Sequence, residues 1–121
     1  MPKIVLSGCN GRMGRAITDI CAAKSDTQIV AGFDLNAVSL SDYPVFSHPA
    51  EFTGDCDVVI DFSNAALTEE LLAFCLSRHV PVVICTTGHS PEQLAQIQAA
   101  SEQIPVFRSG NMSIGINLLM D

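Results

Sequence analysis

Short runs of consecutive apolar residues alternate along this chain with segments in which apolar residues recur every three or four positions. Continuous runs are typical of strands buried on both faces, and the wider spacing is typical of the helices that cover them. The runs predict strands at residues 3–7, 28–34, 57–62, 81–86 and 104–108. The spacing predicts helices at about 11–24, 64–78 and 90–102. This alternation favours a doubly wound, mostly parallel α/β sheet with helices on both faces.

Local signals place several element boundaries. Ser90-Pro91-Glu92-Gln93 combines a capping serine, a proline in the first turn and a glutamine that can close a capping box. Asn64 is a candidate cap for the next helix upstream. The apolar side chains on one face of that helix are those of Leu67, Leu71, Phe74 and Cys75. The segment 35–56 is less regular, and we expect only a short strand at 45–46 and a turn or short helix at 49–53.

The first predicted strand ends in three glycines spaced three apart, Gly8, Gly11 and Gly14, and a helical pattern follows. Glycine permits the sharp turn from strand to helix and lets a phosphate approach the free N–H groups at the helix start. The spacing is a variant of the G-x-G-x-x-G fingerprint of Rossmann-like dinucleotide-binding folds. Glycines also make ordinary turns, so a purely structural role remains open.

Asp34 ends the second predicted strand, twenty residues after Gly14. A carboxylate at this point can accept hydrogen bonds from both hydroxyls of an adenosine ribose, and it would repel a 2′-phosphate. Leu35 follows it, where sites that bind NADP often carry an arginine. The pair predicts a preference for NADH, with NADPH also possible. The alternative is a solvated acid at a strand end.

Polar residues also follow the later strands: Asp61 to Asn64, Cys85 to Gly88, and Ser109 to Ser113. Carboxyl ends of parallel strands meet at one edge of a sheet, so we expect these turns to converge there with the glycine turn. Asp61 and Asn64 have a structural role as their default interpretation. Nothing near Cys85 in the sequence supplies a base or lowers its pKa, so we do not expect a nucleophile.

The composition excludes several functions. The 121 residues carry a net charge of −7, which argues against binding to nucleic acid or an anionic membrane. The five cysteines are scattered without a paired motif, and His, Cys, Asp and Glu show no metal-ligand spacing. No leader or membrane-spanning run is evident. We therefore expect a reduced, cytoplasmic protein without a metal.

Four segments together, GCNGRMG, VVIDFSN, VVICTTG and SGNMSIGIN, resemble the dihydrodipicolinate reductases of bacterial diaminopimelate and lysine biosynthesis. The resemblance covers nearly the whole chain as the N-terminal, nucleotide-binding domain. It implies a cofactor site formed by Gly8, Cys9, Asn10, Gly11, Arg12, Met13, Asp34, Cys85, Thr86, Thr87, Ser109, Gly110, Asn111 and Met112. Family members usually have glycine where this chain has Cys85, and some carry arginine where it has Leu35.

The resemblance also implies what lies outside residues 1–121. The apolar segment 112–121 stops in mid-pattern, so we expect a truncated chain whose C-terminal substrate and tetramerisation domain is absent. In the family that domain supplies the catalytic residues, binds the dicarboxylate and builds a homotetramer. The intact enzyme would transfer a hydride from NAD(P)H to the cyclic precursor of tetrahydrodipicolinate, and this fragment is expected to be inactive. The alternatives are a non-catalytic nucleotide-binding Rossmann module and another two-domain amino-acid dehydrogenase.

Overall fold

Six strands form one sheet in which every pair of neighbours is parallel, in the order β3-β2-β1-β4-β5-β6. The computed structural model describes residues 3–23, 27–39, 42–63, 65–86 and 88–108. The strands are β1 (Lys3–Ser7), β2 (Gln28–Phe33), β3 (Val45–Phe46), β4 (Val58–Asp61), β5 (Val82–Ile84) and β6 (Val106–Arg108). The helices are α1 (Arg12–Ala22), α2 (Thr68–Arg78) and α3 (Pro91–Ser101), with single 3-10 turns η1 (Pro49–Glu51) and η2 (Ala65–Leu67).

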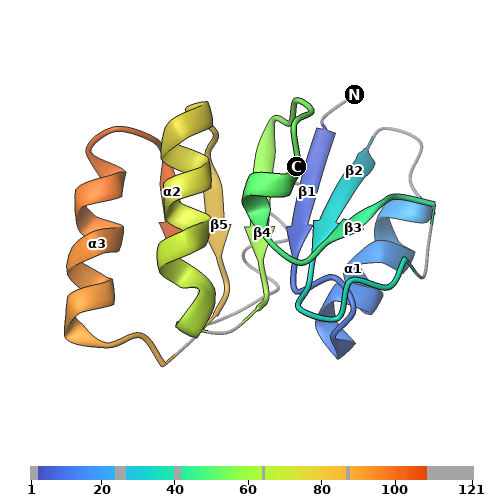
Figure 1. The fold of residues 1–121 in the computed structure, drawn as a ribbon, viewed down its shortest axis with the longest axis horizontal. Coiled ribbons are helices and arrows are strands. Elements are labelled where there is room, and N and C mark those ends of the chain that lie inside the picture. Colours follow the sequence, from blue (N-terminus) through green and yellow to red (C-terminus); the bar gives the residue numbers. More distant parts are fainter. Residues whose placement is uncertain (1–2, 24–26, 40–41, 64, 87, 109–121) are drawn as a thin grey trace.

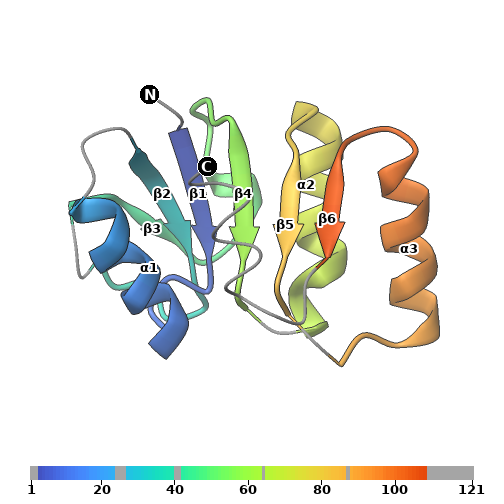
Figure 2. The ribbon, with the colours of Figure 1, turned by 180° about the vertical axis from the view of Figure 1, so that it is seen from behind.

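The helices lie on both faces of the sheet, as predicted. α2 and α3 lie on one face of it in Figure 1, and α1 lies on the other face, toward β2 and β3, which is in front when the molecule is turned (Figure 2). The chain builds outward from β1 first to β2 and β3, then returns to β4 on the other side of β1. The strand order therefore reverses at β1, and ligands of open α/β sheets bind outside the carboxyl ends of the strands at such a point.

Alternation along the strands separates two apolar clusters. Ile4 and Leu6 of β1 belong to the cluster beneath α1, whereas Val5 belongs to the cluster beneath α2 and α3. All three side chains are at most 1% exposed. A central strand buried on both faces needs an unbroken apolar run, which explains why its sequence shows no polar alternation.

Aromatic rings fill the cluster beneath α2. The ring of Phe33 in β2 meets that of Phe74 in α2 edge to face, with centroids 5.3 Å apart. Phe52, which follows η1, lies 6.2 Å from Phe74 by the same measure. Leu71, Phe74 and Cys75 are buried together, which confirms the predicted inner face of this helix, and Leu67 is half-buried at its start.

Most predicted boundaries are confirmed to within a few residues, with differences at the ends. The short strand at 45–46 is present, and η1 falls within the segment 49–53 where a turn or short helix was expected. Ser90 caps α3, and its hydroxyl accepts from Gln93 N–H at 3.2 Å. The predicted helix 64–78 opens instead as a 3-10 turn and becomes α-helical at Thr68. Asn64 lies outside the described residues.

Within the described part of the chain, each helix is too short or too polar to cross a membrane.

Two phenylalanines test how much the aromatic cluster contributes to stability. Phe74 is 5% exposed, and Phe107 in the edge strand β6 is 47% exposed. Phe74→Ala would leave a cavity among packed rings, so we expect the free energy of unfolding in urea to fall by about 3–5 kcal/mol. Phe107→Ala is the matched control and should cost less than about 1 kcal/mol. Equal losses for the two variants would contradict the packing described above.

Candidate functional site

The turn from β1 into α1 leaves no room for side chains at its first and last glycines. Gly8 has φ +81°, and a Cβ there would stand 2.7 Å from the backbone of Phe62 and of Ser63. A Cβ on Gly14 would stand 2.5 Å from the carbonyl oxygen of Cys9. Both glycines are therefore required by the protein's own packing, whatever else the turn does.

Gly11 is different, because nothing in the described structure requires glycine there. It is exposed, its φ of −76° suits any residue, and a Cβ would have only Gly8 O nearby, at 3.5 Å. It is the N-cap of α1, where it offers no side chain to cap the helix, and the first turn contains no acidic residue. The free N–H groups and the positive end of the helix dipole are thus left for an anion.

Asp34 stands beside this turn, at the end of β2. Its Oδ2 accepts the backbone N–H of Asn10 at 3.0 Å, and its Oδ1 accepts that of Asn36 at 3.0 Å. The side chain is half-buried. Each carboxylate oxygen has more than one acceptor position, so both can still accept a hydroxyl from outside the protein.

The side chain of Asn10 joins the glycine turn to the segment that follows Asp34. Its Nδ2 donates to the carbonyl oxygens of Asn36, at 2.7 Å, and of Val38, at 2.8 Å. Sequence reasoning placed Asn10 in the site but missed these contacts, because they join residues 26 and 28 positions apart.

Asp61, at the end of β4, has no exposed surface. Its Oδ1 accepts hydrogen bonds from Ser63 N–H at 2.9 Å and from Ser63 Oγ at 2.5 Å. Its Oδ2 accepts from the hydroxyl of Thr86 at 3.1 Å. These bonds satisfy a buried charge and tie the end of β4 to the end of β5, so the carboxylate acts as a structural connection.

Both thiols that were predicted to lie in the site are held in the protonated form. Burial, with a contribution from the Asp34 carboxylate, raises the pKa of the Cys9 thiol to about 11. Burial and the Asp61 carboxylate raise the pKa of the Cys85 thiol to about 11. This agrees with the expectation that Cys85 is not an activated nucleophile. Cys9 is wholly buried, so its thiol is not accessible to a ligand.

The predicted convergence of strand ends is confirmed where the structure describes them. Gly8 N–H donates to Phe33 O at 2.7 Å, which joins the first turn to the end of β2, and Cys85 N–H donates to Asp61 O at 3.0 Å. Arg12 is exposed and Met13 half-buried in the first turn of α1. Thr87 and the segment 109–112 lie outside the described residues.

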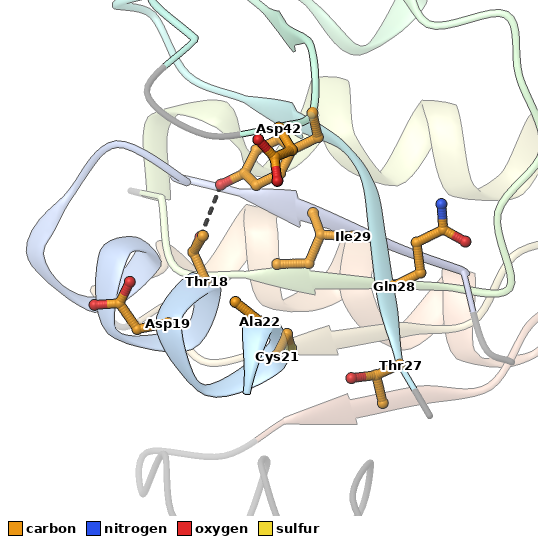
Figure 3. A pocket seen from close by; sticks show the side chains of 9 residues that line it. Thr18, Asp19, Cys21, Ala22, Thr27, Gln28, Ile29 and Asp42 are labelled. Carbon is orange, nitrogen blue, oxygen red and sulfur yellow. Dashed lines mark hydrogen bonds between the residues drawn. The ribbon is translucent and has the colours of Figure 1, made fainter. Parts of the chain in front are cut away.

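A groove of about 500 Å³ lies away from this edge, between α1, the start of β2 and Tyr43. Figure 3 shows Asp19, Thr27 and Asp42 around it. Two lining residues connect the groove to the glycine turn. Thr18 Oγ1 lies 2.7 Å from the hydroxyl of Tyr43 and donates to the carbonyl oxygen of Gly14 at 2.8 Å. None of the described residues that line the groove belongs to the glycine turn, so we do not assign the groove to the candidate site.

The described residues contain no group of three or more His, Cys, Asp and Glu side chains placed to hold a metal ion. The edge of the sheet does provide an uncapped helix start, a backbone at Gly11 that no side chain covers, and the carboxylate of Asp34. An uncapped helix start can bind a phosphate, and a neighbouring carboxylate can accept hydrogen bonds from sugar hydroxyls.

Comparison with known proteins adds independent information. The sequence profile of the family described as "Dihydrodipicolinate reductase, N-terminus" matches residues 2–112. The 4-hydroxy-tetrahydrodipicolinate reductase of Clostridium tetani (strain Massachusetts / E88) is 45% identical over 119 residues, which cover 98% of this chain and 47% of that protein. That of Clostridium botulinum (strain Eklund 17B / Type B) is 47% identical over the same length and with the same coverage.

A solved structure shows the same architecture. The dipicolinate-bound dihydrodipicolinate reductase of Paenisporosarcina sp. TG-14 superposes with a TM-score of 0.80 at 27% sequence identity. The match covers 99% of this chain and 51% of that chain. The present chain therefore spans about half the length of the relatives that it matches.

Replacing each of the three glycines by alanine should lower the free energy of unfolding by a different amount. Gly8→Ala and Gly14→Ala each place a Cβ against backbone atoms, and we expect each to lower the free energy of unfolding by at least about 2 kcal/mol. Gly11→Ala meets open space and should cost less than about 1 kcal/mol, the usual scale of an N-cap change. Urea denaturation measures all three, and a loss at Gly11 as large as at Gly14 would show that packing requires Gly11 too.

Proposed function

Because this chain belongs to the dihydrodipicolinate reductase N-terminal domain family, we propose that it binds NADH, and NADPH less tightly, for the reductase of which such a domain forms part. The observation that carries the proposal is Gly11, a glycine that the fold does not need, at the uncapped start of α1. Because glycine has no side chain, the backbone at that point allows the close approach of a pyrophosphate.

The pyrophosphate would bind along residues 8–13. Gly11 opens the path to the N–H groups of the first turn of α1, and Arg12 is exposed beside them. Because the chain carries a net charge of −7, attraction of an anion depends on these local donors and not on the overall field.

The adenosine ribose would bind at Asp34. Its two carboxylate oxygens are oriented by the backbone N–H groups of Asn10 and Asn36, and both retain acceptor capacity for the ribose hydroxyls. Leu35 is 62% exposed and offers no positive charge to a 2′-phosphate. Repulsion by Asp34, with an uncharged residue at position 35, favours NADH over NADPH.

The nicotinamide end would lie at Cys85, Thr86 and Thr87, with the segment 109–112 closing the site. The Thr86 hydroxyl donates to Asp61, which fixes the direction of its oxygen lone pairs, so that the oxygen can accept a hydrogen bond from a carboxamide. The side chain of Cys85, at a position where members of the family usually have glycine, would narrow this end of the proposed site.

The reaction proposed for the full-length protein is reduction of the cyclic dihydrodipicolinate precursor to tetrahydrodipicolinate. A bound nicotinamide supplies the hydride from C4. The residues of this chain would bind and orient the dinucleotide, and the substrate dicarboxylate and the proton donor would meet a separate C-terminal domain. We propose a homotetramer for the full-length protein and a cytoplasmic location.

The proposed site predicts a clear order of affinities. NADH should bind more tightly than NADPH when each is titrated by its fluorescence. Asp34→Ala removes charge-assisted hydrogen bonds worth about 1.5–3 kcal/mol each, so NADH affinity should fall about tenfold or more. The same change should leave NADPH affinity unchanged or higher. Tighter binding of NADPH than of NADH by the unchanged protein would overturn the preference.

Gly11→Ala separates binding from folding. We expect a loss of NADH affinity of about tenfold or more, because the methyl group blocks access to charge-assisted donors at the helix start. Circular dichroism and the urea midpoint should stay close to those of the unchanged protein. Leu35→Ala is the matched control, since it alters an exposed side chain that the proposal does not use for NADH. Undiminished NADH binding by Gly11→Ala would remove the main support for the proposed function.

Catalysis should require residues beyond this chain. We expect the 121-residue protein to oxidise NADH no faster than buffer in the presence of the cyclic substrate. A fusion of this chain to the C-terminal half of a relative, such as the Clostridium tetani reductase, should show turnover. Normal steady-state NADH oxidation by the 121-residue protein alone would contradict this division of roles.

A further inference from the structure

We propose that Asn10 is a positioning residue that fixes the loop 34–38 and thereby sets the preference for NADH over NADPH. The inference rests on the proposed function, since it concerns how the Asp34 carboxylate is held for an adenosine ribose. We call residues 34–38 the acid loop.

Asn10 binds the acid loop at three points. Both Nδ2 hydrogens are used, in bonds of 2.7 Å to Asn36 O and 2.8 Å to Val38 O. Its backbone N–H adds a bond of 3.0 Å to Asp34 Oδ2. One residue of the glycine turn therefore holds the carboxylate and the backbone that follows it.

The other contacts described for the acid loop lie within it or join it to β3 and to the segment that leads into β3, where the adjacent Ser39 hydroxyl donates to Tyr43 O at 2.8 Å. The residues from 35 to 39 are exposed, so apolar burial contributes little to their position. Backbone bonds from Asp34 N–H to Phe46 O, at 3.0 Å, and from Val38 N–H to Asn36 O, at 2.8 Å, shape the loop. Neither of these two bonds connects it to the glycine turn, and the bonds of Asn10 do.

This arrangement fixes the distance between the carboxylate and Gly11. A rigid Asp34 can accept both ribose hydroxyls, and it cannot turn away from a 2′-phosphate. Once the hydrogen bonds of the Asn10 side chain are removed, the acid loop is free to move and the Asp34 carboxylate can turn with it. NADH then loses oriented acceptors, whereas NADPH escapes part of the repulsion.

The test compares Asn10→Ala and Asn10→Ser, neither of which can bridge the two carbonyl oxygens. We expect the ratio of the NADPH to the NADH dissociation constant to fall about tenfold in each, the scale of one or two lost hydrogen bonds. ADP-ribose and its 2′-phosphate, titrated by calorimetry, should show the same change, because they probe the adenosine half alone. Asn36→Ala is the matched control: it keeps the backbone carbonyl and N–H, so its ratio should match that of the unchanged protein.

A double-mutant cycle with Asp34→Ala identifies the route of the effect. If Asn10 acts through Asp34, Asn10→Ala should change NADH affinity less than about twofold once Asp34 is gone. Equal weakening of NADH and NADPH by both Asn10 variants, or an undiminished effect in the absence of Asp34, would overturn the inference. Failure of the unchanged protein to bind either dinucleotide would instead overturn the proposed function. Thermal unfolding checks that each variant is folded. If Asn10→Ala does not fold, the comparison is made with Asn10→Ser alone.

Discussion

The turn between β1 and α1 is the constraint on which the remaining geometry depends. Gly8 lies so close to Phe62 and Ser63 that a single methyl group would collide with the backbone, and Gly14 lies as close to the carbonyl of Cys9. These contacts set how α1 leaves the sheet and where its first N–H groups point. They also bring the end of β4 against the start of the turn, so that the two strand ends can share one edge.

Two aspartates lie at the carboxyl ends of β2 and β4, the strands on either side of β1, yet their surroundings give them different roles. Asp61 is fully buried, and donors from Ser63 and Thr86 occupy both of its oxygens. Asp34 is half-buried, and each of its oxygens accepts one backbone N–H. A carboxylate without solvent contact must be satisfied by the protein, whereas one that reaches solvent can exchange water for the hydroxyls of a ligand.

The parts of the fold that depend on local sequence were predictable. The capping box at Ser90 needs only four residues, and the apolar runs identify the buried strands because a parallel sheet is covered on both faces. The 64–78 helix begins instead with a 3-10 turn, and the register between β1 and β2 shifts between Ile4 and Val5. Apolar periodicity carries no signal for either feature.

For the site, sequence predicted which residue types gather at the edge but not what each one does. The three glycines are equivalent as letters, and only their surroundings separate Gly11 from the two that packing requires. The bonds of Asn10 cross 26 and 28 residues, so nothing in its local sequence could reveal them.

The two ends of the proposed site differ in how they are held together. The adenosine end is connected by hydrogen bonds within residues 8–46, from Gly8 to Phe33, from Asn10 to Asp34 and from Asp34 to Phe46. The proposed nicotinamide end would instead depend on the bonds that Cys85 N–H and the Thr86 hydroxyl donate to Asp61. The adenosine end takes no part in hydride transfer, and binding energy from such a remote part of a ligand can hold its reactive end in place. A preorganised adenosine end that needs only the first half of the sheet is therefore suited to anchoring the dinucleotide while groups at the other end approach and leave.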